Sequence, residues 1–278
     1  MNASDSDGIS PIGDGAKSLF GDRPQLWGML HIGALPATPK SSKSPDQLVQ
    51  DCLAEASLLA ESGLDGLILE NMHDVPYVQP PASPEVIANM TRLADAVRKQ
   101  HPDLPLGIQI LASANREALA VAHACNLDFI RAEGFVFAHV ADEGWTDANA
   151  GALMRYRKSL GAEHIRIFTD IKKKHSAHAV TADVDLVETA EAAEFFLSDG
   201  LIITGTSTGK AASADDLNAV ADAVNLPVII GSGVNPSNLA AFARADALIA
   251  GSYLKKDGRW DQPLDRGRVM RLVEAVKS

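Results

Sequence analysis

The chain has 278 residues, of which 46% are hydrophobic and 5% are aromatic, and its formal net charge is −11. This length is enough to bury one substantial core, whereas the acidic balance and the lack of a Lys/Arg-rich block exclude a general nucleic-acid-binding surface. No apolar stretch approaches the roughly 20 residues of a membrane span. These features predict a soluble, cytoplasmic protein, in which an anionic ligand would be captured locally by backbone dipoles and a few cationic side chains.

Residues 1–22 differ in composition from the rest of the chain. They contain four Asp and one Lys, with Gly and Ser between them, and no apolar segment of a secretory signal. We expect a flexible N-terminal tail over residues 1–22 and one folded domain over residues 23–278. Cys52 and Cys125 lie in helix-like segments with apolar neighbours, and we expect both to be buried thiols.

Eight short apolar runs follow in order, and a loop and a segment of helical length come after each of them. Continuous apolar runs are typical of parallel strands that are covered on both faces. The expected strands are residues 26–30, 66–70, 106–110, 127–131, 164–170, 200–204, 227–230 and 247–250. Helix start signals stand between them, such as the capping box Ser44-Pro45-Asp46-Gln47. Strict alternation with eight repeats predicts a single α/β domain, a parallel eight-stranded (β/α)₈ TIM barrel.

The glycine-rich segments come late in the chain. A dinucleotide-binding fold would carry GxGxxG after the first strand, and residues 30–36 hold no such motif. The glycines instead follow the last three expected strands, where the loops of a TIM barrel meet and can hold a phosphate. A helix starting at Asn235-Pro236-Ser237 would point at the same place. The expected phosphate-binding residues are Gly205, Thr206, Ser207, Gly209, Gly231, Ser232, Gly233, Gly251 and Ser252. The alternative is that these residues only build tight turns.

Polar side chains mark the ends of the earlier strands. In the fifth run the period of two separates three isoleucines from a face that holds Arg166, Phe168, Asp170 and Lys172, and we expect this polar face to point into the barrel. Glu70 ends an otherwise apolar run, and His31 follows the first strand. The expected catalytic residues are Glu70, Asp170, Lys172 and His31. An internal ion pair that only fills the barrel axis is the alternative for Asp170 and Lys172.

Other polar residues at the same end of the expected barrel suit substrate binding. Arg131, for example, offers a planar fork to a carboxylate or a second phosphate. The expected substrate-binding residues are Asn71, Gln109, Arg131, Glu133, Lys174 and His175. His31, Glu70, Asp170 and His175 are residue types that suit a divalent metal, but they lack diagnostic spacing such as HExxH. We therefore predict no metal or cofactor, with a divalent ion as an alternative.

Several of these motifs together resemble the BtpA/SgcQ family. They are the segment Gly28-Met29-Leu30-His31-Ile32-Gly33-Ala34-Leu35-Pro36, the segment from Leu69-Glu70-Asn71 to Asp74-Val75-Pro76, the run Asp170-Ile171-Lys172-Lys173-Lys174-His175, and the late glycine-rich loops. The resemblance runs from about Trp27 to the C-terminal segment. It implies a TIM-type barrel and a family named for a factor required to accumulate photosystem I reaction-centre proteins, with other members in carbohydrate-utilisation systems. Residues 34–38 depart from the PLPG turn that is common in the family.

Three functions are compatible with these patterns. The first is an enzyme that isomerises, epimerises or cleaves a phosphorylated sugar or related metabolite, with acid–base or Schiff-base chemistry at Glu70, Asp170 and Lys172. The second is a non-catalytic assembly or regulatory factor, as the family name implies. A nucleotide-binding enzyme or phosphohydrolase is the third. The expected partner is a small phosphorylated molecule, without nucleic acid or a membrane span, and a homo-oligomer is compatible with the fold.

Overall fold

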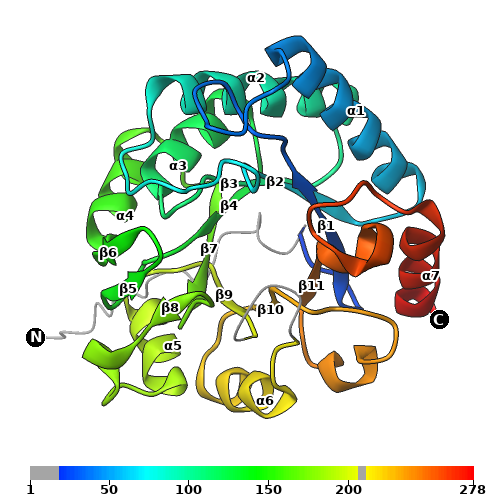
Figure 1. Cartoon of the computed structure of the whole chain (residues 1–278). Coiled ribbons are helices and arrows are strands. Elements are labelled where there is room, and N and C mark those ends of the chain that lie inside the picture. The colour runs from blue at the N-terminus through cyan, green and yellow to red at the C-terminus, as the bar shows by residue number, and fades with distance from the viewer. Residues whose placement is uncertain (1–18, 206–210) are drawn as a thin grey trace, which may run out of the picture.

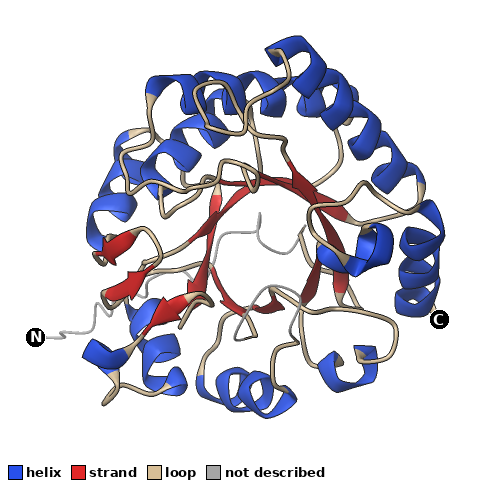
Figure 2. Ribbon diagram, viewed as in Figure 1, coloured by secondary structure: helices blue, strands red, loops and turns tan. Residues whose placement is uncertain are grey.

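The computed structural model describes residues 19–205 and 211–278, which form a closed barrel of eight parallel strands inside a ring of helices (Figures 1 and 2). Strand β1 pairs with both β2 and β11, and these two pairings close the sheet. The barrel strands are β1 Gln25–His31, β2 Gly66–Glu70, β3 Leu106–Gln109, β4 Phe129–Ala132, β7 Arg166–Ile171, β9 Gly200–Ile203, β10 Val228–Ile230 and β11 Ala247–Ala250. The predicted TIM barrel is confirmed, and each barrel strand overlaps a predicted one.

Helices within the described residues cover the outside of the barrel. They are α1 Pro45–Glu61, α2 Pro84–Gln100, α3 Asn115–Ala124, α4 Ala150–Ser159, α5 Leu186–Phe195, α6 Ala214–Ala223 and α7 Arg266–Lys277. The predicted capping box forms at α1, where the Ser44 hydroxyl accepts a hydrogen bond from the Gln47 backbone N–H and the Gln47 side chain accepts one from Ser44. Ser213 caps α6 in the same way through two backbone N–H groups.

The connection between β10 and β11 differs from the expectation. A helix was predicted to start at Asn235-Pro236-Ser237, but the Asn235 side chain accepts hydrogen bonds from the Ser237 N–H and hydroxyl and closes a turn there. Only a short 3₁₀ helix, Leu239–Phe242, follows this turn. An Asn side chain that bonds to the backbone two residues on favours a turn over a helix, which explains the difference.

Aromatic rings fill the N-terminal half of the barrel interior. Trp27 stacks on Phe129 with 4.7 Å between ring centroids, and Phe168 lies 5.3 Å from Phe129 and 5.7 Å from Trp27. Glycines on neighbouring strands provide the room for these rings. A Cβ at Gly107 would lie 2.1 Å from the Phe129 ring, and one at Gly200 would lie 2.8 Å from Phe168. This half of the barrel is a packed core, so a ligand has space only at the C-terminal half.

The segment before β1 closes the N-terminal end of the barrel. Leu19 is buried, and the Phe20 ring lies 5.7 Å from Trp27 and 5.8 Å from Phe168. Both residues fall within the segment that was predicted as a flexible tail over residues 1–22. The packing of Leu19 and Phe20 on the barrel rings therefore extends the ordered structure beyond the prediction, while residues 1–18 lie outside the described residues.

A small antiparallel sheet, which the sequence patterns did not predict, joins two loops at the C-terminal end of the barrel. It consists of β5 His139–Ala141 and β6 Gly144–Thr146, from the loop after β4, and β8 Ser176–Ala177, from the loop after β7. Figure 1 shows these three strands beside the barrel, between α4 and α5. The sheet fixes the loop that follows β7, which carries the run of lysines.

Candidate functional site

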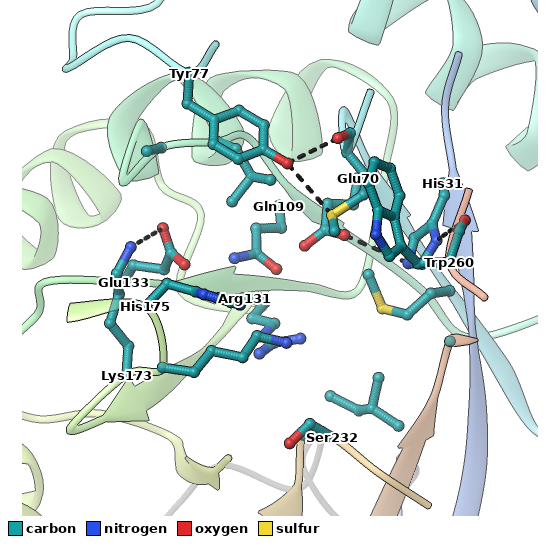
Figure 3. A pocket seen from close by; sticks show the side chains of 18 of the residues that line it. His31, Glu70, Tyr77, Gln109, Arg131, Glu133, Lys173, His175, Ser232 and Trp260 are labelled. Atoms are coloured by element: carbon teal, nitrogen blue, oxygen red, sulfur yellow. Dashed lines mark hydrogen bonds and ion pairs between the residues drawn. The ribbon is translucent and has the colours of Figure 1, made fainter. Parts of the chain in front are cut away.

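A cavity of about 290 Å³ opens at the C-terminal ends of the barrel strands (Figure 3). Its walls are the loops that follow β2, β3, β4, β7, β10 and β11, which come together although they lie far apart in the sequence. Active sites of TIM barrels lie at this end, because the loops after the strands can vary while the barrel holds them in place.

His31, Glu70 and Gln109 form one row across three neighbouring strands. The strand register pairs His31 with Glu70 and Glu70 with Gln109, and all three residues line the cavity. The His31 Nε2 and Glu70 Oε2 atoms are 3.6 Å apart. Burial lowers the pKa of His31 to about 3, and burial raises the pKa of Glu70. Both shifts favour the neutral forms, so this contact is not an ion pair at neutral pH.

Arg131 projects from β4 into the cavity, and Asp170 on β7 forms an ion pair with it in the barrel interior. The Arg131 Nε and Nη2 atoms donate to both Asp170 oxygens at 3.0–3.2 Å, and both side chains are buried. Burial opposes the charge on Arg131, but Asp170 and then Glu70 outweigh it and raise the pKa of the guanidinium. Asp170 does not line this cavity. Arg131 and Asp170 therefore form an internal ion pair, in which only the Arg131 side chain faces the cavity.

Glu133 and Lys173 occupy the side of the cavity next to Arg131. The Lys173 Nζ lies 3.4 Å from Glu133 Oε2 and 3.5 Å from Glu143 Oε1. Glu133 also accepts a hydrogen bond of 3.1 Å from the Ser113 N–H. Burial would raise the pKa of Glu133, but Lys173 and then Arg131 hold it below its usual value. Lys173 and Glu143 were not among the predicted site residues, although Lys173 lies within the predicted run.

Lys172 and Lys174, which follow β7, do not point in the same direction, although the strand period of two predicts that they do. At Lys172 the backbone φ is 46°, so the strand alternation ends and its side chain leaves the cavity. The Lys172 Nζ donates to the carbonyl oxygens of Thr181 and Val184 beside a separate small cavity. Lys174 lines the main cavity instead. The prediction that placed Lys172 at the mouth therefore differs from the structure, because the left-handed turn shifts the alternation after Ile171.

Lys174 is the cation of the cavity that has no hydrogen-bond partner among residues 19–205 and 211–278. Burial, and then the nearby Arg131 charge, lower the pKa of its amine, against the opposing effects of Glu70, Asp170 and Glu133. A lowered pKa increases the fraction of neutral amine, which is the form that accepts protons and attacks carbonyl carbons. His175 stands at the rim, where burial and then Lys174 lower its pKa.

The late loops form the part of the cavity wall that follows β10 and β11, and Gly251 lies beside the His31 ring. Gly231, Ser232 and Gly233 follow β10, and Gly251 and Ser252 follow β11; all of them line the cavity. The Ser232 hydroxyl accepts a hydrogen bond of 2.7 Å from the Gly205 N–H, so Gly205 supports this wall without lining it. The remaining predicted residues of this group, Thr206, Ser207 and Gly209, lie outside the described residues.

Asn71 supports the cavity wall from behind. Its side chain accepts a hydrogen bond from the Leu111 N–H and donates to the Leu111 carbonyl and to Asp74, so it joins the loops after β2 and β3. These loops bring Met72, Tyr77 and Leu111 to the cavity, and the segment after β11 brings Trp260. The sequence patterns did not single out these apolar lining residues.

Within the described residues, no group of three or more His, Cys, Asp or Glu side chains could hold a metal ion. The divalent-metal alternative therefore has no preformed site there, since His31 and Glu70 are adjacent but Asp170 is engaged by Arg131. None of the helices in this part of the chain is long and apolar enough to cross a membrane.

A closed parallel barrel with a charged cavity at the C-terminal ends of its strands defines the class of this protein: it is a TIM-barrel protein. Residues 23–278 match the family model of the BtpA family, and the chain belongs to that family. A mitochondrial, uncharacterised protein of Caenorhabditis elegans is 50% identical over 267 residues, 95% of this chain and 96% of that protein. The photosystem I biogenesis protein BtpA of Synechocystis is 30% identical over 251 residues, 90% of this chain and 86% of that protein.

Solved structures with a similar fold are enzymes of low sequence identity. The (S)-3-O-geranylgeranylglyceryl phosphate synthase of Thermoplasma acidophilum, in complex with sn-glycerol-1-phosphate, superposes with a TM-score of 0.61 at 16% identity, over 95% of this chain and 97% of that one. The thiamine phosphate pyrophosphorylase of Pyrococcus furiosus gives 0.56 at 13% identity, over 91% and 95%. At such identities the likeness describes the fold, and the chemistry has to be argued from the residues.

Proposed function

We propose that this protein is an enzyme that acts on a small phosphorylated metabolite, by proton transfer next to a carbonyl group or by carbon–carbon cleavage. The observation that carries the proposal is the half-buried amine of Lys174, which has no hydrogen-bond partner among the described residues and lies in a cavity that also holds Glu70 and the late-loop glycines. Withdrawing such a charge from water is costly unless a ligand or a reaction uses it. The names of the fold neighbours, which include phosphate-containing substrates and products, are consistent with this class.

The phosphate would lie against the late loops. Gly231 and Gly251 bring backbone without a side chain to the cavity, because a Cβ at Gly231 would lie 2.4 Å from Ile202 and one at Gly251 would lie 3.2 Å from the His31 ring. A backbone without side chains lets N–H groups approach an anion closely. Arg131 supplies a fixed positive charge nearby. The phosphate therefore anchors one end of the substrate, and the reacting carbon faces Glu70 and Lys174.

Glu70 and Lys174 divide the chemistry between them. The raised pKa of Glu70 and the lowered pKa of Lys174 bring both groups toward neutral pH, where a general acid and base are most effective. In the Schiff-base variant, the neutral Lys174 amine attacks a substrate carbonyl carbon, the carbonyl oxygen leaves as water, and an imine remains. Lys174 takes the role that the sequence patterns assigned to Lys172.

Phosphate binding is tested first by isothermal titration with inorganic phosphate and with glycerol phosphate. Ser252→Asp places a negative charge at the proposed phosphate position, and Ser252→Asn is the neutral control of the same shape. We expect phosphate esters to bind the wild type and Ser252→Asn, and to bind Ser252→Asp at least tenfold more weakly. Equal binding to all three proteins, or no binding to the wild type, contradicts the phosphate site.

The chemistry is tested by borohydride reduction in the presence of phosphorylated ketoses and aldoses, followed by mass spectrometry of the peptide that contains Lys174. An adduct on Lys174 in the wild type, absent from Lys174→Arg, supports the Schiff-base route. An adduct on another lysine contradicts it. If no adduct forms, exchange of substrate C–H hydrogen with deuterated solvent distinguishes proton transfer from no reaction, with Glu70→Gln as the comparison.

A non-catalytic biogenesis factor is the second candidate. The photosystem I biogenesis protein BtpA of Synechocystis is a relative, and the match covers 86% of that protein. A relative in Caenorhabditis elegans, which has no photosystem, argues against this as the general role of the family. Complementation of a deletion strain by Glu70→Gln combined with Lys174→Met discriminates, because full biological activity of that double variant favours the non-catalytic role. For the location we propose the cytoplasm or another reducing compartment, since Cys52 and Cys125 are free and buried.

A further inference from the structure

The cavity has a second, apolar end, and we propose that its ligand carries a planar, largely apolar ring with one hydrogen-bonding edge, joined to the phosphate. This inference rests on the proposed function for the phosphate end and adds the substrate class at the other end. The ring would lie against Tyr77 and Trp260, and the Gln109 amide would bind its polar edge. The ligand class is therefore a phosphorylated carbonyl compound that carries an aryl or heterocyclic ring, rather than a simple sugar phosphate.

Tyr77 and Trp260 lie across the cavity from the late loops. Figure 3 shows Tyr77 and Trp260 on one side of the cavity and Ser232 on the other. The Tyr77 hydroxyl already donates a hydrogen bond of 2.7 Å to the Met72 carbonyl, so its ring, and not its hydroxyl, is what it offers to a ligand. Burial, and then Glu70, raise the pKa of Tyr77, which keeps this hydroxyl protonated. Apolar lining residues beside these rings are Met72, Val75, Leu111 and Ala112.

Trp260 is fixed in place by its neighbours. Its ring centroid lies 5.0 Å from that of His73 at an interplanar angle of 45°, and its carbonyl oxygen lies 3.4 Å from His31 Nδ1. The ring therefore forms a stable wall beside the His31 and Glu70 row. Aromatic walls bind planar rings by stacking or edge contacts, and these contacts add affinity beyond the burial of apolar surface. A polyhydroxylated chain would leave this aromatic wall exposed to water. The hydroxyl groups of such a chain would also lack hydrogen-bond partners there.

Gln109 gives the ring a specific orientation. It is the last residue of β3, 2% exposed, and its Oε1 atom has no hydrogen-bond partner among the described residues. Gln109 lines the cavity between Glu70 on β2 and Arg131 on β4, the two strands that flank β3 (Figure 3). A buried amide oxygen without a partner is costly, and a ligand N–H or O–H would satisfy it, while the NH₂ of the same amide can donate to a ligand acceptor. A carboxamide or lactam edge offers both.

The test compares phosphate esters that differ only in the group attached to phosphate: methyl, cyclohexyl, phenyl and 3-carbamoylphenyl phosphate, by isothermal titration on the full chain. We expect phenyl phosphate to bind at least tenfold more tightly than methyl phosphate. The carbamoyl group should add a further fivefold or more, and Gln109→Met should remove only that last gain. Equal binding of cyclohexyl and phenyl phosphate overturns the planar ring, and equal binding of methyl and phenyl phosphate overturns the apolar end while the phosphate site stands.

Variants of the aromatic wall separate this inference from the proposed function. Trp260→Leu and Tyr77→Leu are each expected to remove the gain of phenyl over methyl phosphate and to leave methyl phosphate affinity unchanged. Trp145→Leu, an exposed tryptophan outside this cavity, is the matched control and should change neither. Benzamide, which has no phosphate, tests the ring end alone: binding that Trp260→Leu weakens supports the ring site even if every phosphate ester fails. If neither benzamide nor phenyl phosphate binds the wild type, the inference is wrong.

Discussion

The Arg131 guanidinium and the Asp170 carboxylate form a bidentate ion pair in the barrel interior, with 4% and 2% of their side chains exposed. The pair lies at the boundary between the aromatic half of the barrel and the cavity, so it holds a fixed positive charge at the cavity floor. Because Asp170 keeps Arg131 in one orientation, we assign Asp170 a positioning role and Arg131 contact with the ligand.

Breaking this pair should be more harmful than removing both charges. We expect Asp170→Leu or Arg131→Met alone to lower the free energy of unfolding by about 3 kcal/mol, because each leaves an unpaired buried charge. The Arg131→Met/Asp170→Leu double variant should be more stable than either single variant, although it should lose affinity for phosphate esters. Urea denaturation of the four proteins measures the cycle, and additive losses would contradict a coupled pair.

His31 should make the protein sensitive to acid. Its pKa is about 3 in the folded protein, because of burial, and about 6.5 in an unfolded chain, so between these values the unfolded state binds the additional proton. Stability therefore falls as the pH decreases through this window, by about 2 kcal/mol between pH 7 and pH 5. We expect His31→Gln to flatten this part of the profile relative to wild type, as measured by denaturation at a series of pH values.

The control for this experiment is His123→Gln, on the exposed face of α3, which should keep the slope of the wild-type profile. Since Glu70 contacts His31, the same series on Glu70→Gln shows whether the acid sensitivity depends on that neighbour. A His31→Gln profile as steep as that of the wild type would mean that other groups cause the acid response.

Lys172 and Lys174 should respond in opposite ways to the same substitution. Lys174→Met removes a half-buried cation that has no hydrogen-bond partner among the described residues, so the protein should keep or gain stability but bind phosphate esters at least tenfold more weakly. Lys172→Met removes hydrogen bonds to the Thr181 and Val184 carbonyls, so it should lose about 1–2 kcal/mol of stability and keep its affinity. Thermal denaturation and titration calorimetry on both variants test the pair, and the reverse pattern would restore Lys172 to the site.

Gly107 should be irreplaceable for steric reasons. A methyl group there would meet the Phe129 ring at 2.1 Å, so Gly107→Ala should cost about 2 kcal/mol of stability. Adding Phe129→Leu should recover part of that loss, because the smaller side chain leaves space. Gly151→Ala, within α4, is the control and should stabilise the helix by about 0.5–1 kcal/mol. Equal effects of the two alanine substitutions would be inconsistent with a ring-filled barrel.

The barrel could be predicted from the sequence because its strands are short apolar runs separated by helix signals, a local pattern that survives folding. Glu70, Arg131 and the late glycines could be placed near a shared cavity, since parallel strands bring their carboxyl ends together. Lys172 could not be placed in this way: its positive φ ends the strand alternation, and the loop that follows pairs through β8 with β5, a segment distant in the sequence. Tyr77 and Trp260 lie in loops without periodicity, so their approach to the cavity is visible only in the folded chain.

The small sheet of β5, β6 and β8 ties the loop after β4 to the loop that carries Lys173 and Lys174. The backbone pairing of β5 with β8, in which Ala141 lies opposite Ser176, does not depend on side-chain identity, so this link tolerates sequence drift but not a change in the length of one loop alone. Among descendants of this chain, insertions or deletions in the two loops should therefore arise together. Lys173 and Lys174, from the loop after β7, and Asp142 and Glu143, from the loop after β4, would then evolve as one inherited unit.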